Sequence, residues 1–185
     1  MYNVLVVDDE PAMVNAMRRV IARIPRNWLD EGCQVTGVSD PGDALERLDG
    51  DAPYAVVIAD LRMPAINGIE LLRRAREAQP DAVRIIMSGH GDFPAVLAAI
   101  NDTQVFRFLP KPWKDDEMQR AVVQAIRTGE LQRENEQLAA KARARAGSVS
   151  NHDTDLRKLE AEYPGITHVD RDESGAICLD AGDLN

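Results

Sequence analysis

The sequence predicts an α/β protein built on a doubly wound, five-stranded parallel sheet with helices on both faces. Over the first two-thirds of the 185 residues, short apolar runs rich in β-branched residues alternate five times with amphipathic stretches. The clearest run, YAVVIA at 54–59, is apolar throughout, which is typical of a strand buried on both faces. Buried strands separated by helices indicate a parallel sheet, and ligand sites in such sheets lie at the carboxyl ends of the strands.

Each strand and helix is predicted from a local pattern. The strands are expected at Tyr2–Val7, 34–38, 54–59, 83–87 and 105–109. The helices are expected at 11–24, from Pro41 to Leu48 with Asp40 as its cap, at Gly68–Ala78, and at 93–100 with Asp92 as its cap. A last, long helix begins near Asp115 or Asp116. Proline at a first helical position and aspartate just before it are common helix-start signals.

Composition excludes several classes of protein. The formal charge of -9 argues against a non-specific nucleic-acid binder, which needs basic surface to face phosphates. Cys33 and Cys178 have no metal-ligand spacing, and the chain shows neither a signal peptide nor a membrane-spanning segment. We therefore expect two reduced thiols and a cytoplasmic protein without nucleic acid as a partner.

Polar residues follow the predicted strands where each strand ends. Asp8 and Asp9 follow the first strand, Asp60 the third, Ser88 the fourth and Lys111 the fifth. Clustered carboxylates repel one another unless a cation lies between them, and hard oxygen ligands favour Mg²⁺. A carboxylate can act as a nucleophile that forms an acyl phosphate, with a metal and a lysine neutralising the phosphoryl oxygens. A helix cap would explain one such aspartate, but explains the whole set poorly.

Four segments resemble the receiver domain of two-component response regulators: LVVDDEP, VVIADLRMPAINGIELL, IIMSGHG and FRFLPKPW. The resemblance covers about residues 1–128, and the D-x-R-M-P-x-x-N-G stretch and the final Lys-Pro are specific in this order and spacing. It implies a flavodoxin-like sheet of strand order 2-1-3-4-5, and a cis peptide bond before Pro112.

The resemblance also implies a role for each site residue. Asp60 would accept the phosphoryl group, while Asp8, Asp9, Asp60 and the backbone carbonyl of Arg62 would bind Mg²⁺. Ser88 and Lys111 would contact the phosphoryl oxygens, and Phe108 would be the switch aromatic that moves on activation. Phe108 can equally be an ordinary core residue, and His90 either positions a water or is an exposed loop residue.

The remaining chain is predicted to extend the receiver. Residues 129–146 continue the last helix, with heptad positions a at Thr128, Asn135 and Ala142 and d at Leu131 and Leu138. This pattern predicts a short dimerising coil over 128–145, with a solvated helical spacer as the alternative. Residues 147–151 (GSVSN) read as a linker, and 152–185 as a small acidic tail with a β-hairpin.

The expected function is a phospho-accepting switch rather than an enzyme. A histidine kinase would phosphorylate Asp60, and the chain would signal to a downstream protein through altered protein contacts. A homodimer would form through the receiver face, the coil, or both. The alternative is that the chain is the receiver fragment of a larger regulator with an output enzyme or a transcriptional domain.

Overall fold

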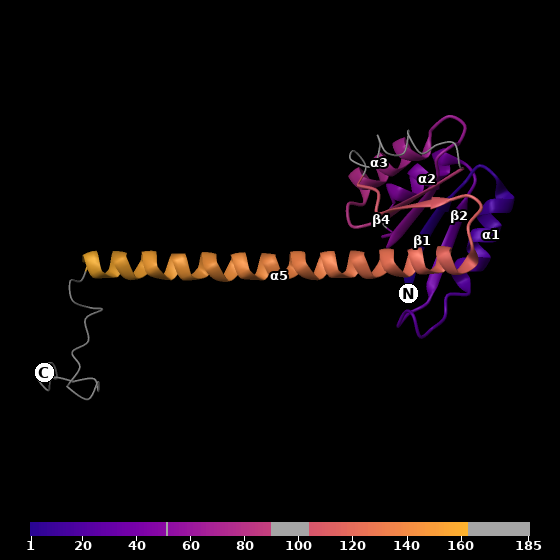
Figure 1. The fold of residues 1–185 in the computed structure, drawn as a ribbon. Coiled ribbons are helices and arrows are strands. Elements are labelled where there is room, and N and C mark those ends of the chain that lie inside the picture. Colours follow the sequence, from indigo (N-terminus) through magenta and orange to yellow (C-terminus); the bar gives the residue numbers. More distant parts are fainter. Residues whose placement is uncertain (51, 90–103, 163–185) are drawn as a thin grey trace, which may run out of the picture. The chain divides into compact units, whose positions relative to one another are not determined.

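The computed structural model describes residues 1–50, 52–89 and 104–162 (Figure 1). The chain divides after Glu134 into two units. The first unit contains a five-stranded sheet of order β2-β1-β3-β4-β5, in which every neighbouring pair of strands is parallel. Both the α/β class and the strand order are therefore confirmed.

The strands lie within a few residues of their predicted positions. They are β1 (Tyr2–Val7), β2 (Cys33–Val38), β3 (Val56–Asp60), β4 (Val83–Ser88) and β5 (Arg107–Pro110). Every residue of β3 and β4 is buried, as expected for central strands of a covered sheet. Both strands extend one residue beyond the predicted end, so Asp60 and Ser88 are their last residues.

Four helices are described: α1 (Pro11–Ala22), α2 (Pro41–Leu48), α3 (Gly68–Ala78) and α5 (Asp115–Glu162). The Asp40 side chain accepts a hydrogen bond of 2.6 Å from the Gly42 N–H, which confirms the predicted cap of α2. The helix predicted at 93–100 and the predicted hairpin of the tail lie outside the described residues.

The sheet is covered on both faces, and successive side chains along each strand point to opposite faces. One core contains Val4 and Val6 of β1, Ile58 of β3, and apolar residues of α1 and α5. The other contains Leu5 and Val7 of β1 together with apolar residues of α2 and α3. This alternation has the two-residue period of a strand, and it fixes which way each polar residue at a strand end can point.

The last helix is longer than predicted. An end near Ala146 and a linker at 147–151 were expected, but α5 is continuous from Asp115 to Glu162. The linker prediction is therefore wrong. One glycine in a helix costs only about 1 kcal/mol relative to alanine, and the residues before Gly147 are alanine, arginine and lysine, which favour helix. Within the described residues, no helix has the length and apolar content that a transmembrane span requires.

Candidate functional site

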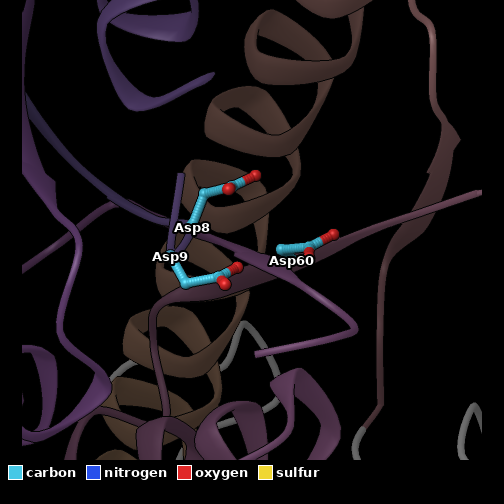
Figure 2. A group of neighbouring side chains, drawn as sticks. All are labelled: Asp8, Asp9 and Asp60. Carbon is cyan, nitrogen blue, oxygen red and sulfur yellow. The ribbon is translucent and has the colours of Figure 1, made fainter. Parts of the chain in front are cut away.

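The polar residues predicted to converge are all found at the carboxyl ends of the strands. Asp8 and Asp9 follow β1 directly, Asp60 ends β3, Ser88 ends β4, and Lys111 follows β5. Because β1, β3 and β4 are neighbours in the sheet, their ends meet at one edge. Figure 2 shows the side chains of Asp8, Asp9 and Asp60 grouped there.

The three aspartates differ in their exposure to solvent. Asp8 is fully buried, Asp60 is 6% exposed, and Asp9 is exposed. One carboxylate oxygen from each lies within 4.8 Å of the others. The Glu10 N–H donates a hydrogen bond of 2.9 Å to Asp8 Oδ1, which holds this carboxylate at the start of α1. The group therefore offers hard oxygen ligands of the kind that Mg²⁺ prefers, so the residues fit the expected metal.

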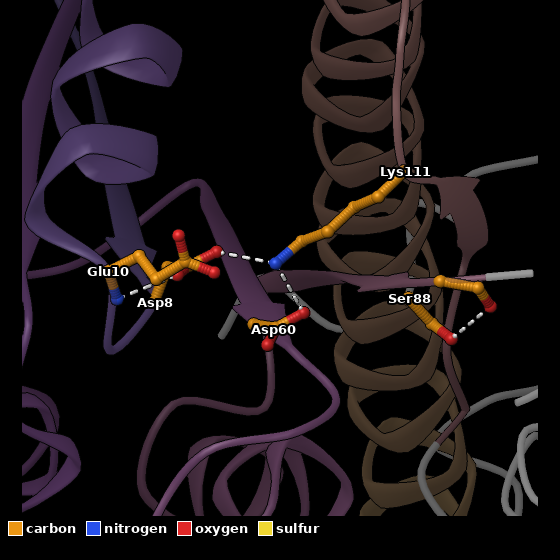
Figure 3. Close-up of polar contacts among 6 residues, drawn as sticks. Asp8, Glu10, Asp60, Ser88 and Lys111 are labelled. Carbon is orange, nitrogen blue, oxygen red and sulfur yellow. Dashed lines mark hydrogen bonds and ion pairs between the residues drawn. The ribbon is translucent and has the colours of Figure 1, made fainter.

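A single ammonium group bridges the two buried carboxylates. Lys111 Nζ lies 2.8 Å from Asp8 Oδ2 and 2.7 Å from Asp60 Oδ1. Figure 3 shows the Lys111 side chain reaching toward both carboxylates. Burial acts to lower the pKa of Lys111, but the hydrogen bonds with Asp60 and Asp8 outweigh it and the pKa is raised. Lys111 is therefore positively charged at neutral pH.

The pKa of Asp60 is raised despite the adjacent lysine. Burial is the largest cause, and the charge of Asp8 adds to it, while Lys111 and the Arg62 N–H act in the opposite direction. Desolvation and like charge both disfavour a bare carboxylate at this position. A cation or an electrophilic phosphorus near Asp60 would reduce both the cost of desolvation and the repulsion from Asp8.

The backbone after β3 is built so that α3 begins close to Asp60. Ala65 has a positive φ of 67°, and the Asn67 side chain caps α3 by accepting a hydrogen bond from the Glu70 N–H at 2.9 Å. A Cβ added at Gly68 would lie 2.1 Å from the carbonyl oxygen of Asp60. Sequence reasoning gave Gly68 only as a helix start, although the Asn-Gly pair was a signal for this close approach.

Ser88 and Lys111 are joined through the backbone. The Lys111 N–H donates to the Ser88 carbonyl at 2.8 Å, and the Lys111–Pro112 peptide bond is cis, as predicted. Ser88 is 1% exposed, and its hydroxyl donates to the Gly89 carbonyl at 3.1 Å (Figure 3). Phe108 is half-buried against the core formed with α2 and α3. The switch role of Phe108 and the ligand role of the Arg62 carbonyl stay predictions, and His90 lies outside the described residues.

Comparisons with known proteins agree with this geometry. Residues 4–123 match the family model of the response regulator receiver domain. The hydrogenase transcriptional regulatory protein HoxA of Bradyrhizobium diazoefficiens is 34% identical over 146 residues, which are 79% of this chain and 28% of HoxA. The transcriptional regulatory protein FixJ of the same species is 33% identical over 166 residues, 90% of this chain and 76% of FixJ.

Solved structures give the same result. An adenylate cyclase from Rhodopirellula baltica has a TM-score of 0.65 at 29% identity, covering 75% of this chain and 97% of that one. NtrX from Brucella abortus has a TM-score of 0.65 at 26% identity, covering 75% of this chain and 30% of that one. The chain thus spans only about a quarter of the length of HoxA, but most of the length of FixJ. This chain belongs to the response regulator receiver domain family.

Proposed function

We propose that the chain is a two-component response regulator that accepts a phosphoryl group from a histidine kinase on Asp60. The observation that carries this proposal is the environment of Asp60, which is buried, adjacent to Asp8 and bridged to Lys111. Desolvation makes its carboxylate a more reactive nucleophile than an exposed one, and the nearby cation offsets charge on the incoming group.

The transfer step follows from this arrangement. A carboxylate oxygen of Asp60 attacks phosphorus and forms an O–P bond, while the P–N bond to the donor imidazole breaks. The electron pair returns to the imidazole nitrogen, which takes up a proton. The product is an acyl phosphate on Asp60, whose carboxyl oxygen is bonded to phosphorus and no longer carries the ion pair with Lys111.

Asp8, Asp9, Asp60 and the backbone carbonyl of Arg62 would hold Mg²⁺. When bound, this ion would neutralise charge on the phosphoryl oxygens and orient them for in-line transfer. Asp9 is the exposed member of the group, so the site is open to the phosphoryl donor on that side. Asp8 is buried and forms the inner wall of the site.

Residues that already surround Asp60 would then bind the phosphoryl group. Lys111 exchanges its bond to the Asp60 carboxylate for a bond to a phosphoryl oxygen, and the Ser88 hydroxyl turns from the Gly89 carbonyl toward the new acceptor. The Lys111 N–H to Ser88 carbonyl bond couples the two strand ends. Phe108 lies three residues before Lys111, and we propose that it repacks when this edge moves.

The output of the switch is proposed to be an altered set of protein contacts, made with a second copy or with a downstream protein. A second candidate is that the chain is the receiver part of a larger regulator. It is favoured by relatives such as HoxA, whose length this chain covers only to 28%.

Transfer from acetyl phosphate tests the proposal. The full chain is incubated with acetyl phosphate and Mg²⁺, and its intact mass is compared with that of Asp60→Asn and Asp43→Asn. Asp43 is an exposed carboxylate in the first turn of α2 and serves as the control. We expect one phosphoryl adduct on wild type and Asp43→Asn, none on Asp60→Asn, and none after Mg²⁺ is chelated. An equal adduct on Asp60→Asn would contradict the proposal.

A further inference from the structure

The two edge strands of the sheet differ in how well they are protected against pairing with a further strand. At one edge, β5 has four residues, begins with the charged Arg107 and ends with Pro110. Shortness, charge and proline are features that keep an edge strand from pairing further. At the other edge, β2 has six residues, CQVTGV, without charge or proline, and it pairs with β1 along its whole length. β2 is therefore the edge at which another strand can be added.

The backbone hydrogen bonds of β2 show which of its groups face outward. The Tyr2 N–H donates to the Gly32 carbonyl at 3.0 Å, and the Asp8 N–H donates to the Val38 carbonyl at 3.3 Å. Alternate residues of a strand bond to the same neighbouring strand, so the even-numbered residues of β2 bond to β1. The residues whose N–H and C=O groups point away from β1 are Cys33, Val35 and Gly37. Within the described residues these groups form no hydrogen bond, so they offer an incoming strand both donors and acceptors.

A groove between α1 and β2 lies beside these outward groups. It has a volume of about 500 Å³ and is lined by Asn15, Arg18, Arg19 and Ala22 of α1 and by Cys33 and Val35 of β2. A Cβ added at Gly37 would lie 2.9 Å from Cδ of Arg18, so the missing side chain allows the arginine stem to cross β2. Cys33 and Val35 pack against the core on the α1 face of the sheet. Side chains on the α1 face of an added strand would therefore enter this groove.

The arginines of this groove belong to a basic patch. Arg18, Arg19, Arg23 and Arg26 are all exposed, on α1 and on the loop that follows it. None of the four forms an ion pair with the rest of the described chain, and Glu31, near the start of β2, is paired with the N-terminal ammonium group. The charge of -9 on the whole chain opposes an acidic ligand, but charges more than about 8 Å apart are largely screened at physiological ionic strength. The patch therefore favours an acidic occupant of the groove.

Other occupants match this edge less well. A second copy would present its own β2, which has no acidic side chain to pair with the arginines. A nucleic acid would contact the arginines, but it would not form a strand ladder with the outward N–H and C=O groups. An extended acidic peptide segment uses both features of the surface.

We propose that the outer edge of β2 and the adjoining α1 groove bind an extended, acidic segment of another protein, which adds to the sheet as a further strand. Main-chain hydrogen bonds give such a complex its affinity, and alternate side chains give it specificity. Acidic side chains on the α1 face pair with Arg18 and Arg19, and β-branched side chains on the other face pack beside Thr36 and Val38. This surface does not include Asp60, so its occupation requires no phosphoryl group.

Fluorescence anisotropy with a designed peptide tests the charge requirement. The probe is a dye-labelled, capped peptide in which valine and glutamate alternate, and its control carries glutamine in place of glutamate. We expect the glutamate peptide to bind the full chain, and the glutamine peptide to bind roughly tenfold less tightly, because each exposed ion pair contributes a factor of up to about five. Arg19→Glu should weaken binding to a similar degree. Arg47→Glu, an equal change of charge on α2 at the other face of the sheet, should leave it unchanged. No binding to wild type, or equal binding of the two peptides, would overturn the proposal.

Amide hydrogen exchange tests whether the peptide adds as a strand. When the glutamate peptide binds the full chain, we expect the outward amides of Cys33, Val35 and Gly37 to exchange more slowly. The amides of Gln34 and Thr36 already bond to β1 and should change much less. Binding without this alternation would mean that the peptide only neutralises the arginines, and strand addition would be wrong. Slow exchange of the outward amides without peptide would show that the chain itself or a second copy covers this edge, which would also contradict the proposal.

Two further measurements define the class of ligand and separate it from the phosphorylation site. A labelled single-stranded DNA oligonucleotide should bind the chain more weakly than the glutamate peptide does, and tighter binding of the DNA would overturn the assignment to a protein segment. Asp60→Asn should bind the peptide as wild type does, because the edge of β2 does not include Asp60. Loss of peptide binding in Asp60→Asn would contradict this independence. A failure of peptide binding is thus distinguishable from a failure of phosphorylation.

Discussion

At the scale of single residues, the site depends on how one lysine balances two carboxylates. Asp8 is fully buried and Asp60 nearly so, and both carboxylates form ion pairs with Lys111 Nζ. Removing one partner of a buried ion pair leaves an uncompensated charge, which destabilises a protein far more than losing a surface pair. Lys111 therefore has a structural role in the unmodified protein, and we propose a different role for it after phosphorylation.

We predict that Lys111→Ala lowers the free energy of unfolding by about 2 kcal/mol in the absence of divalent metal, because Asp8 and Asp60 then lose their shared cation. Mg²⁺ should restore part of this loss, and should raise the urea midpoint of Lys111→Ala more than that of wild type. Urea unfolding with and without Mg²⁺ measures both effects. Lys114→Ala, at an exposed position nearby, is the control, and equal midpoints for the two variants would contradict this account.

Gly68 makes a second residue-scale prediction. Its Cβ would lie 2.1 Å from a backbone oxygen of Asp60, and backbone cannot move aside as a flexible side chain can. Gly68→Ala should therefore destabilise the fold by about 1–3 kcal/mol, and should slow phosphorylation because Asp60 must shift. Gly32→Ala is a matched control, since an added Cβ there meets nothing within 4 Å. Wild-type stability and phosphorylation in Gly68→Ala would show that the close approach is unimportant.

At the scale of elements, α5 is fastened to the receiver along one side by polar contacts. The Arg120 guanidinium lies 5.6 Å from the centre of the Trp28 ring, and Arg127 donates to the Trp28 carbonyl at 2.8 Å. The Tyr2 hydroxyl donates to the Glu130 carboxylate, which joins β1 to α5. These contacts fix the rotation of α5 about its axis, and the direction in which Leu131 points depends on that rotation.

The contact between Tyr2 and Glu130 predicts a dependence on pH. The hydrogen bond to Glu130, with burial, raises the pKa of Tyr2 from 10.0 to about 12. A raised folded-state pKa means that the stabilisation is complete below pH 10 and is lost as the pH rises toward 12. Tyr2→Phe should therefore be less stable than wild type by up to about 1 kcal/mol at pH 8, with the difference vanishing near pH 12. The ultraviolet difference titration of wild type against Tyr2→Phe measures this pKa, and a value near 10 would contradict the prediction.

At the scale of the whole molecule, much of the receiver unit could be predicted from sequence. The buried runs of β1, β3 and β4 indicate central parallel strands, and Asp8, Asp60 and Lys111 were placed correctly because strand ends are strongly marked. The bridging by Lys111 depends on side-chain packing, which periodicity does not encode. The end of α5 was missed because Gly147 is a local signal, whereas helix continuation depends on the whole neighbouring sequence.

The candidate site and helix α5 lie next to each other in the chain. The proposed phosphoryl site lies at the carboxyl ends of the strands, and α5 is the helix that follows Lys111. Three residues lie between Lys111 and the start of α5, so the connection from the end of β5 to α5 is short.

The measurement that tests the central claim most directly is the chemical location of the phosphoryl group. The full chain is phosphorylated with acetyl phosphate and Mg²⁺ and then treated with hydroxylamine, which converts an acyl phosphate into a hydroxamate that survives digestion. Peptide mass spectrometry then identifies the modified residue. We predict a hydroxamate on Asp60, and none on Asp8 or Asp9. A hydroxamate on another carboxylate, or none in protein that is folded and bound to Mg²⁺, would contradict the assignment of Asp60 as the phosphoryl acceptor.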